Sequence, residues 1–301
     1  MARFIYSVLL LCFASATAEE EVLSRVKRII GGSIATRGQW PWLVSLHGKF
    51  ISERIPILGI PIAFRHKFCG GSVLNDRWIL TAAHCFDGPE GHISNRWEAR
   101  LAATSLRNNF LDTLRNILSH IVDREDWRTW EIDIDRIVIH PRYNASDYWA
   151  NDIALVRLEE PVPSGPHFSR ISSINLPNYA NFSFPAVGTH CTMKGWGCTS
   201  GGGLVSNHAH SVVLPVFDSA SCSILRRASN NHNRICAGFD NSNRGICPGD
   251  SGGPLSCLNE RGEWLQVGVA SFASVHRPGD YPGVFTRVSS YVNWIHSVIY
   301  R

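Results

Sequence analysis

Apolar residues occur in this chain in short runs separated by turn residues, and this pattern constrains the fold more than any other feature of the sequence. The runs have the length of β-strands, are rich in β-branched and aromatic residues, and lie at spacings typical of all-β folds. They occupy residues 42–46, 72–74, 78–80, 137–139, 153–156, 267–270 and 284–286. We therefore expect an all-β protein.

Two segments depart from the strand pattern. Apolar side chains in 101–130 recur at helical spacing, which predicts one short helix there. Near the C-terminus, apolar residues gather on one helical face, and the preceding pair Ser289 and Ser290 predicts a serine cap at the start of a final helix. The residues of that face are Val292, Ile295, Val298 and Ile299.

The composition is that of a globular protein with a substantial core. Of 301 residues, 44% are hydrophobic and 18% are charged, and this length suits one large domain or two of ordinary size. The net charge of +4 is small and the basic residues are scattered along the chain. We therefore expect no nucleic-acid partner.

The N-terminus has the pattern of a secretory signal. Arg3 precedes an apolar run over 5–13, and the small residues at 16–18 form a cleavage site before an acidic stretch. No apolar run is long enough to cross a bilayer. We therefore predict a signal peptide at 1–18, secretion to the extracellular space and no membrane anchor.

The cysteine count agrees with export. Of nine cysteines, Cys12 would leave with the signal, and the remaining eight predict four disulfides. Zinc binding is the alternative use of these side chains, but the chain has neither paired C-x-x-C spacing nor an H-E-x-x-H pattern. We expect no metal and no cofactor.

The segment CPGDSGGP at 247–254 has the clearest chemical content. Five of its eight residues are Gly or Pro, which hold the backbone in turns around Ser251. A serine hydroxyl needs a base to become a nucleophile. The segment 81–85 offers the imidazole of His84, and 151–155 offers the carboxylate of Asp152. Alone, Gly-Asp-Ser-Gly would equally fit a surface turn, but the three residues together in this order predict a catalytic triad.

The chain resembles the chymotrypsin family of serine proteases, which includes trypsin and elastase. The motifs run in family order: RIIGG at 28–32, FCGGS at 68–72, TAAHC at 81–85, DIAL at 152–155, GWG at 195–197, CAG at 236–238, GDSGGP at 249–254 and PGV at 282–284. The resemblance implies two six-stranded antiparallel β-barrels and a C-terminal helix in a protease domain over 29–301. The first barrel would cover about 29–160 and the second about 161–301, with the active site between them.

The resemblance also assigns the chemistry to individual residues. Ser251 would attack the scissile carbonyl, and His84 would take its proton and then pass it to the leaving amine. Asp152 would orient the imidazole and would itself accept a hydrogen bond from Ser271. The backbone N–H groups of Gly249 and Ser251 would bind the oxyanion.

Residues 19–28 match an activation propeptide in this family. Cleavage between Arg28 and Ile29 would create an α-amino group that inserts beside Asp250 and forms a buried ion pair. The RVKR sequence at 25–28 suits either a proprotein convertase or a trypsin-like activator. No cysteine remains before Ile29 once the signal is removed, so we expect the propeptide to be released. A flexible charged tail is the alternative interpretation.

The residues that would line the substrate pocket are small and uncharged. Gly245, six residues before Ser251, stands where trypsin-like members carry Asp, and Gly283 carries no acid either. A cationic substrate side chain would therefore be buried without a partner. Ala273 and Gly283 would leave an open apolar slot for large side chains, which is chymotrypsin-like. Ala273 and Phe272 stand where the family usually has Gly and Trp, so an elastase-like preference is the alternative.

The resemblance implies three disulfides by family position, namely Cys69–Cys85, Cys191–Cys257 and Cys222–Cys236. The usual partner of Cys247 is missing from this chain, and the resemblance leaves Cys198 as its partner in a Cys198–Cys247 pair. Two free thiols are the alternative.

Two loops are longer than in compact relatives, over 47–67 and between His84 and Asp152. They would either rim the cleft or be tolerated surface insertions. Asn144 and Asn181 begin glycosylation sequons.

These features together predict a secreted serine endopeptidase, made as a zymogen and acting as a monomer. Its expected partners are protein or peptide substrates, an activating protease that cuts after Arg28, and protein protease inhibitors. A catalytically inactive homologue that serves as a binding module is the alternative from another class. Among active enzymes, a digestive role and a narrow processing role both remain open.

Overall fold

The computed structural model describes residues 32–54, 61–107, 129–165, 170–200, 203–218, 222, 231–242, 244–274 and 279–301. The expected signal peptide and propeptide, with Arg28 and Ile29, lie outside the described residues. So does 108–128, which is most of the segment expected to contain a short helix.

The first β-barrel is closed and antiparallel, with strand order β2-β3-β4-β7-β6-β5. Its strands are β2 (Leu43–Arg54), β3 (Pro61–Val73), β4 (Trp78–Thr81), β5 (Trp97–Leu101), β6 (Trp130–Ile139) and β7 (Ala154–Leu158). In β5, Trp97, Ala99 and Leu101 are buried while Glu98 and Arg100 are half-buried, as the alternation of a strand requires. The β4 strand is buried along its whole length, so it reads as a continuous apolar run.

The second barrel is closed by the pairing of β8 with β9, and its order is β9-β10-β13-β12-β11-β8. Its strands are β8 (His190–Gly195), β9 (His210–Phe217), β10 (Arg234–Ala237), β11 (Pro254–Leu258), β12 (Trp264–Phe272) and β13 (Gly283–Arg287). Two closed six-stranded antiparallel barrels confirm the fold class that the resemblance predicts.

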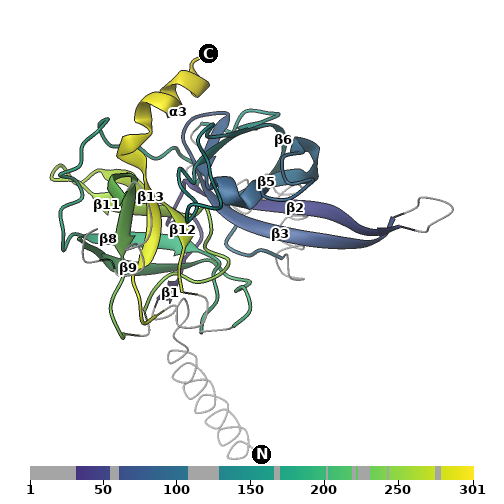
Figure 1. Cartoon of the computed structure of the whole chain (residues 1–301). Helices are drawn as coiled ribbons and strands as arrows, with labels where there is room; N and C mark the ends of the chain where they lie inside the picture. The colour runs from purple at the N-terminus through teal and green to yellow at the C-terminus, as the bar shows by residue number, and fades with distance from the viewer. Residues whose placement is uncertain are drawn as a thin grey trace, which may run out of the picture.

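Each end of the described chain joins the barrel at the other end of the sequence (Figure 1). The short strand β1 (Ser33–Ile34) pairs with β9 of the second barrel. At the other end, Tyr291 and Ile295 of the C-terminal helical region belong to the apolar core of the first barrel. The two barrels are thus linked by the chain ends as well as by the connection between β7 and β8.

The C-terminal helix α3 (Val292–Ile299) is present, but the expected serine cap is wrong. The residue at the N-cap is Tyr291, and its side chain makes no capping hydrogen bond. Ser289 and Ser290 lie within a preceding 3₁₀ turn, η6 (Val288–Ser290), which leads directly into the helix. Their position inside that turn keeps both hydroxyls away from the first free amides of α3.

The expected long loop over 47–67 is a correction as well, because its described parts are strands. The β2–β3 pairing continues from Leu43 opposite Ser72 to Arg54 opposite Pro61. The two strands leave the first barrel as a two-stranded arm, which projects sideways from the molecule in Figure 1. Ile62 and Phe64 are exposed on this arm, so no core periodicity marked it in the sequence.

Lys194 of β8 lies fully buried among three indoles where the two barrels meet. Its Nζ lies 4.1 Å from the ring centroid of Trp40, 5.2 Å from that of Trp42 and 4.7 Å from that of Trp264. Burial lowers the pKa of the Lys194 amine well below its ordinary value. The three rings provide a cation–π environment that acts in the opposite direction.

Candidate active site

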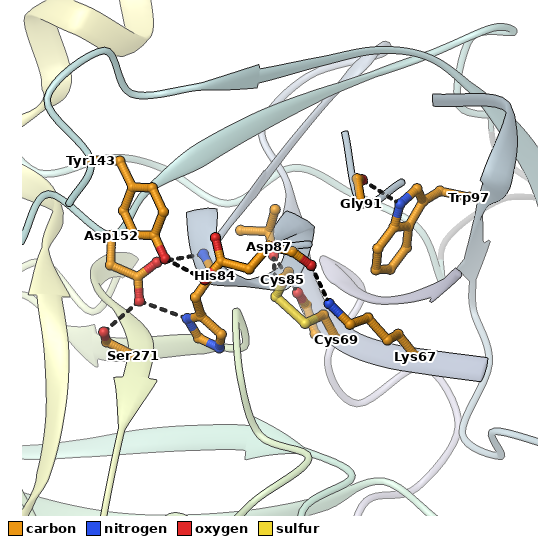
Figure 2. The surroundings of a disulfide bond; sticks show 12 residues. Lys67, Cys69, His84, Cys85, Asp87, Gly91, Trp97, Tyr143, Asp152 and Ser271 are labelled. Atoms are coloured by element: carbon orange, nitrogen blue, oxygen red, sulfur yellow. Dashed lines mark hydrogen bonds and ion pairs between the residues drawn. A yellow bond between two sulfur atoms is a disulfide. The ribbon is translucent and has the colours of Figure 1, made fainter. Parts of the chain in front are cut away.

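His84 lies in a short 3₁₀ helix, η1 (Ala83–Phe86), directly after β4. The Cys69–Cys85 disulfide ties this helix to β3. The Nδ1 atom of His84 lies 2.7 Å from Asp152 Oδ2, and the backbone N–H of His84 donates to Asp152 Oδ1 at 2.9 Å (Figure 2). Because a carboxylate only accepts hydrogen bonds, Nδ1 carries the proton and Nε2 is left as the basic nitrogen.

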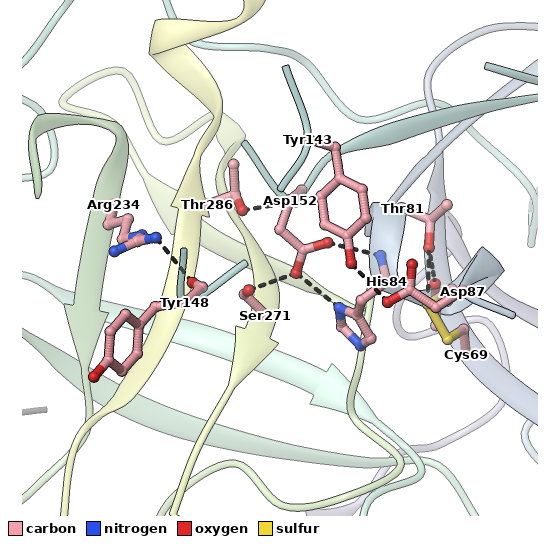
Figure 3. Close-up of polar contacts among 12 residues, drawn as sticks. Cys69, Thr81, His84, Asp87, Tyr143, Tyr148, Asp152, Arg234, Ser271 and Thr286 are labelled. Carbon is pink, nitrogen blue, oxygen red and sulfur yellow. Dashed lines mark hydrogen bonds and ion pairs between the residues drawn. A yellow bond between two sulfur atoms is a disulfide. The ribbon is translucent and has the colours of Figure 1, made fainter. Parts of the chain in front are cut away.

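Asp152 is fully buried, and its oxygens are well supplied with donors. Ser271 Oγ donates to Oδ2 at 2.5 Å, and the Thr286 hydroxyl donates to the backbone carbonyl of Asp152 at 2.7 Å (Figure 3). Both donors come from strands of the second barrel, whereas Asp152 precedes β7 of the first. A buried carboxylate held by several hydrogen bonds keeps the imidazole in one orientation.

The electrostatics of His84 follow from these contacts. Burial lowers the pKa of the imidazole, but the charge of Asp152 and its hydrogen bond raise the pKa by more, so the net shift is upward from 6.5. Asp87 contributes in the same direction. Its carboxylate accepts a hydrogen bond from Tyr143 at 2.7 Å, and Lys67 Nζ donates to its backbone carbonyl at 2.6 Å (Figure 2).

The backbone around Ser251 is hydrogen-bonded to both barrels. Its carbonyl accepts from the N–H of Gly70 at 2.7 Å, and the next residue, Gly252, donates to the carbonyl of Ala270 at 2.8 Å. Gly252 has a φ of +77°, and a Cβ there would overlap the Thr81 hydroxyl, so only glycine fits. These contacts bring Ser251 beside the segment that carries His84.

No hydrogen bond joins the Ser251 hydroxyl to the His84 ring, although the structure describes both side chains. This contact is often long in a site without substrate, and it shortens when the substrate binds.

Asp250, next to Ser251, is buried without a charged partner among the described residues. Its two oxygens accept hydrogen bonds from the backbone N–H groups of Gly197 at 2.8 Å and Cys247 at 3.0 Å. Burial raises the pKa of this carboxyl from 3.8 to about 7, against the lowering effect of the two amides. The environment therefore favours the neutral acid unless a cation reaches it.

Ile246 packs against the residues expected to line the substrate pocket, although it was not predicted to be one of them. Gly245 and Gly283 are buried, and Ile246 is 3% exposed. A Cβ on Gly283 would lie 2.6 Å from Ile246 Cδ1, so this side chain covers Gly283 directly. Ala273 packs at the edge of the same apolar cluster. Ile246 follows Gly245 in sequence, and that adjacency is the signal that could have identified it.

Phe272 has an aromatic neighbour from the first barrel. Its ring centroid lies 5.3 Å from that of Trp149, with an angle of 35° between the ring planes. Trp149 comes three residues before Asp152, and Phe272 directly follows Ser271. The two rings therefore lie next to the His84–Asp152 pair, and Trp149 was not among the residues expected to line the site.

Comparison with known proteins agrees with this geometry. The sequence model of the trypsin family, described as Trypsin, matches residues 29–295. The chain belongs to the trypsin family of serine endopeptidases. It is 31% identical over 273 residues, or 89% of its length, to the serine proteinase stubble of Drosophila melanogaster, and spans 30% of that relative's length.

Among the residues that the structure describes, this member of the trypsin family has four disulfides. They join Cys69 to Cys85, Cys191 to Cys257, Cys222 to Cys236 and Cys198 to Cys247, which are the pairs that the resemblance implies. The Cys198–Cys247 pair is buried, with its Cα atoms 5.4 Å apart. It connects the segment after Gly197 with the segment that leads to Ser251.

The two asparagines that begin glycosylation sequons differ in exposure. Asn144 is exposed and Asn181 is half-buried. Within the described ranges, no group of three or more His, Cys, Asp or Glu is placed to hold a metal ion. No helix in the described part of the chain is long and apolar enough to cross a membrane.

Proposed function

We propose that this chain is a secreted endopeptidase, made as a zymogen, that hydrolyses peptide bonds after apolar residues through Ser251, His84 and Asp152. The observation that carries the proposal is the chain of hydrogen bonds from Ser271 to Asp152 and from His84 to Asp152. These two hydrogen bonds leave Nε2 of His84 as a free base beside the segment that carries Ser251.

The reaction follows from that arrangement. Ser251 Oγ attacks the scissile carbonyl carbon while His84 Nε2 takes the hydroxyl proton. The backbone N–H groups of Gly249 and Ser251 stabilise the negative oxygen of the tetrahedral intermediate. The intermediate collapses as His84 passes the proton to the leaving amine, which leaves an acyl ester on Ser251. Water, activated by His84, then attacks the ester and releases the acid product.

Activation by cleavage after Arg28 gives the buried Asp250 a role. Its raised pKa, about 7, marks a site where a charged carboxylate lacks compensation. The new α-amino group of Ile29 would supply that charge and fix the adjacent Gly249–Ser251 backbone. The sequence pattern at 1–18 supports secretion, and the activator is either a convertase or a trypsin-like enzyme.

The pocket supports a preference for apolar substrate side chains. Gly245, Gly283 and Ile246 offer neither a charge nor a hydrogen-bonding side chain for a basic substrate residue. Large side chains such as Phe, Leu and Met are the first candidates. The contact of Ile246 with Gly283 favours the second candidate, an elastase-like preference, because it shortens the pocket. Protein inhibitors with an apolar residue in this pocket are the matching partners.

Substitution of Ser251 tests the mechanism. After cleavage at Arg28, we expect Ser251→Ala to lower kcat by about 10⁴–10⁶-fold on peptides ending in Phe or Leu, because the nucleophile is gone. Ser297→Ala, an exposed serine on α3, serves as the matched control and should retain activity. A fluorophosphonate probe should label the wild type and the control but not Ser251→Ala. Near-normal turnover by Ser251→Ala would exclude the mechanism, and an unlabelled wild type would identify an inactive homologue. Fastest cleavage after Arg would refute the pocket assignment.

A further inference from the structure

The segment just before Asp152 has an unusual backbone. Tyr148, Trp149 and Asn151 all have left-handed φ angles, at +46°, +53° and +54°. Residues with a Cβ rarely adopt this region, and a bulky tryptophan least of all. Such strain persists only where the surroundings hold the backbone in place.

Arg234 provides a contact of that kind. This residue begins β10 of the second barrel and is only 5% exposed. Its Nη2 donates hydrogen bonds to two consecutive backbone carbonyls, that of Asp147 at 3.1 Å and that of Tyr148 at 2.8 Å. Figure 3 shows the contact with Tyr148. The donor is a buried cation, and hydrogen bonds from charged donors are the stronger kind. One guanidinium group therefore fixes the two residues that precede Trp149.

A neighbouring strand of the second barrel and the start of α3 hold the other end of the same segment. Arg234 pairs with Thr286 of β13, and the Thr286 hydroxyl donates to the carbonyl of Asp152. The Tyr291 hydroxyl donates to the side chain of Asn151 at 2.9 Å. Thr286 and Tyr291 act on Asn151 and Asp152, whereas Arg234 acts at the turn that carries Trp149.

The held turn carries two exposed aromatic side chains, Tyr148 and Trp149. Trp149 is 37% exposed, and its ring lies against the half-buried ring of Phe272. Phe272 belongs to β12, so its place is set by the second barrel. Trp149 belongs to the first barrel and can meet Phe272 only while the turn keeps its present shape.

We propose that Arg234 is a positioning residue for substrate selection: it fixes the indole of Trp149 against Phe272, and the paired rings favour peptides with an apolar side chain close to the scissile bond. The proposal rests on the endopeptidase function proposed above. Arg234 would thus influence which peptides bind, although it has no role in the triad.

Three substrates separate this role from a general effect on the enzyme. They share one apolar residue at the cleaved bond, as a p-nitroanilide. The first is blocked directly at its amino group, the second is extended there by two leucines, and the third by two glycines. For Arg234→Met in the enzyme cut at Arg28, we expect KM for the leucine-extended substrate to rise about tenfold. The kcat values, and KM for the other two substrates, should stay within about twofold of wild type.

Two further variants define the route of the effect. Arg234→Lys keeps the charge but loses the planar fork, so we expect an intermediate KM. Arg157→Met removes a half-buried arginine of β7 that pairs with Asp135, and it should leave KM and kcat for all three substrates unchanged. An equal loss on every substrate, or no loss on any, would overturn the positioning role.

A double-mutant cycle tests whether Arg234 acts through Trp149. Trp149→Ala should show the same selective rise in KM, and adding Arg234→Met to it should cause little further change. Losses that add independently would contradict the coupling.

Hydrogen exchange on the uncut chain gives a readout that needs no catalysis. The amide of Ala150 donates to the carbonyls of Asn144 and Asp147, at 3.0 and 2.9 Å. We expect it to exchange at least tenfold faster in Arg234→Met, because the turn is released. An unchanged rate would refute the role of Arg234 whatever the kinetics. Failure of the cut wild type to cleave any substrate would refute the proposed function instead.

Discussion

At the residue scale, the site depends on what surrounds each titratable group. His84 is a half-buried base and Asp250 a buried acid of the same site, and their neighbours differ. The ionised Asp152 raises the pKa of His84, whereas Asp250 has only backbone amides to support its charge. The first arrangement prepares a base for proton transfer, and the second leaves a carboxyl that needs a cation.

The pH dependence of activity follows from the raised pKa of His84. Catalysis needs the neutral imidazole, so we expect kcat/KM to rise with pH through an apparent pKa above 6.5. Asp152→Asn should lower kcat by about 10⁴-fold, because the ring loses its orienting acceptor. The pH dependence of stability has the opposite sign to that of kcat/KM. The His84–Asp152 contact stabilises the fold fully below pH 6.5, and this contribution is lost as pH rises through the pKa of His84 in the folded state. Rate profiles and urea unfolding between pH 5 and 9 measure both trends, and a kcat/KM that falls over this range would contradict them.

The pocket side chain Ile246 gives a second prediction. Ile246→Ala should raise the ratio of kcat/KM for Phe over Ala substrates by about tenfold or more, because it removes the group that covers Gly283. The same change should lower the free energy of unfolding by about 2–5 kcal/mol, since Ile246 is packed in the core of the second barrel. Substrate panels and urea unfolding measure the two effects. An unchanged ratio would mean that Ile246 does not limit the pocket.

At the element scale, strands with a buried face were predictable and contacts between distant elements were not. The runs at 78–80 and 153–156 became β4 and β7 because both are buried throughout. The two-stranded arm was missed because it leaves the core, so its residues need no alternation. Arg234 touches residues 86 and 87 positions away, and no local pattern in β10 indicates that contact. The residues of the proposed triad could be predicted only because each lies in a short motif with its own chemistry.

Lys194 on β8 gives a prediction for the seam between the barrels. Its folded pKa is below the ordinary 10.5, so its charge costs stability at low pH, and this cost disappears as pH approaches 10.5. Lys194→Met fills similar space without a charge. We expect it to raise the free energy of unfolding at pH 7 by about 1–3 kcal/mol, with a smaller gain at pH 10. Urea unfolding followed by tryptophan emission measures the difference. A destabilised variant at pH 7 would show that the three indoles stabilise the cation by more than burial costs.

At the scale of the whole molecule, the proposed active site is assembled by two barrels that each supply part of it. The first barrel provides His84 and Asp152, and the second provides Ser251 and the hydroxyl of Ser271. The family motifs predicted this division. They could not predict that Trp149 from one barrel meets Phe272 from the other.

Asp250 gives a prediction for the whole chain before and after cleavage. Its folded pKa of about 7 lies above the ordinary 3.8, so ionisation lowers stability progressively as pH rises from 3.8 to 7. The uncut Asp250→Asn chain should therefore unfold at a higher temperature than wild type at pH 8, with little difference below pH 4. Cut at Arg28, the variant should stay inactive because no ion pair forms. Thermal unfolding and peptide hydrolysis test the two halves of this expectation. Full activity of the cut variant would refute the activation role.

The placement of the two chain ends has a consequence for dividing the molecule. Strand β1 belongs to the N-terminal half in sequence but to the second barrel in space, while the C-terminal helical region packs on the first barrel. If the chain were divided in the connection between β7 and β8, each fragment would carry a segment that packs on the barrel of the other fragment. Such fragments are suited to complementation, in which protease activity reports that two fused proteins have met.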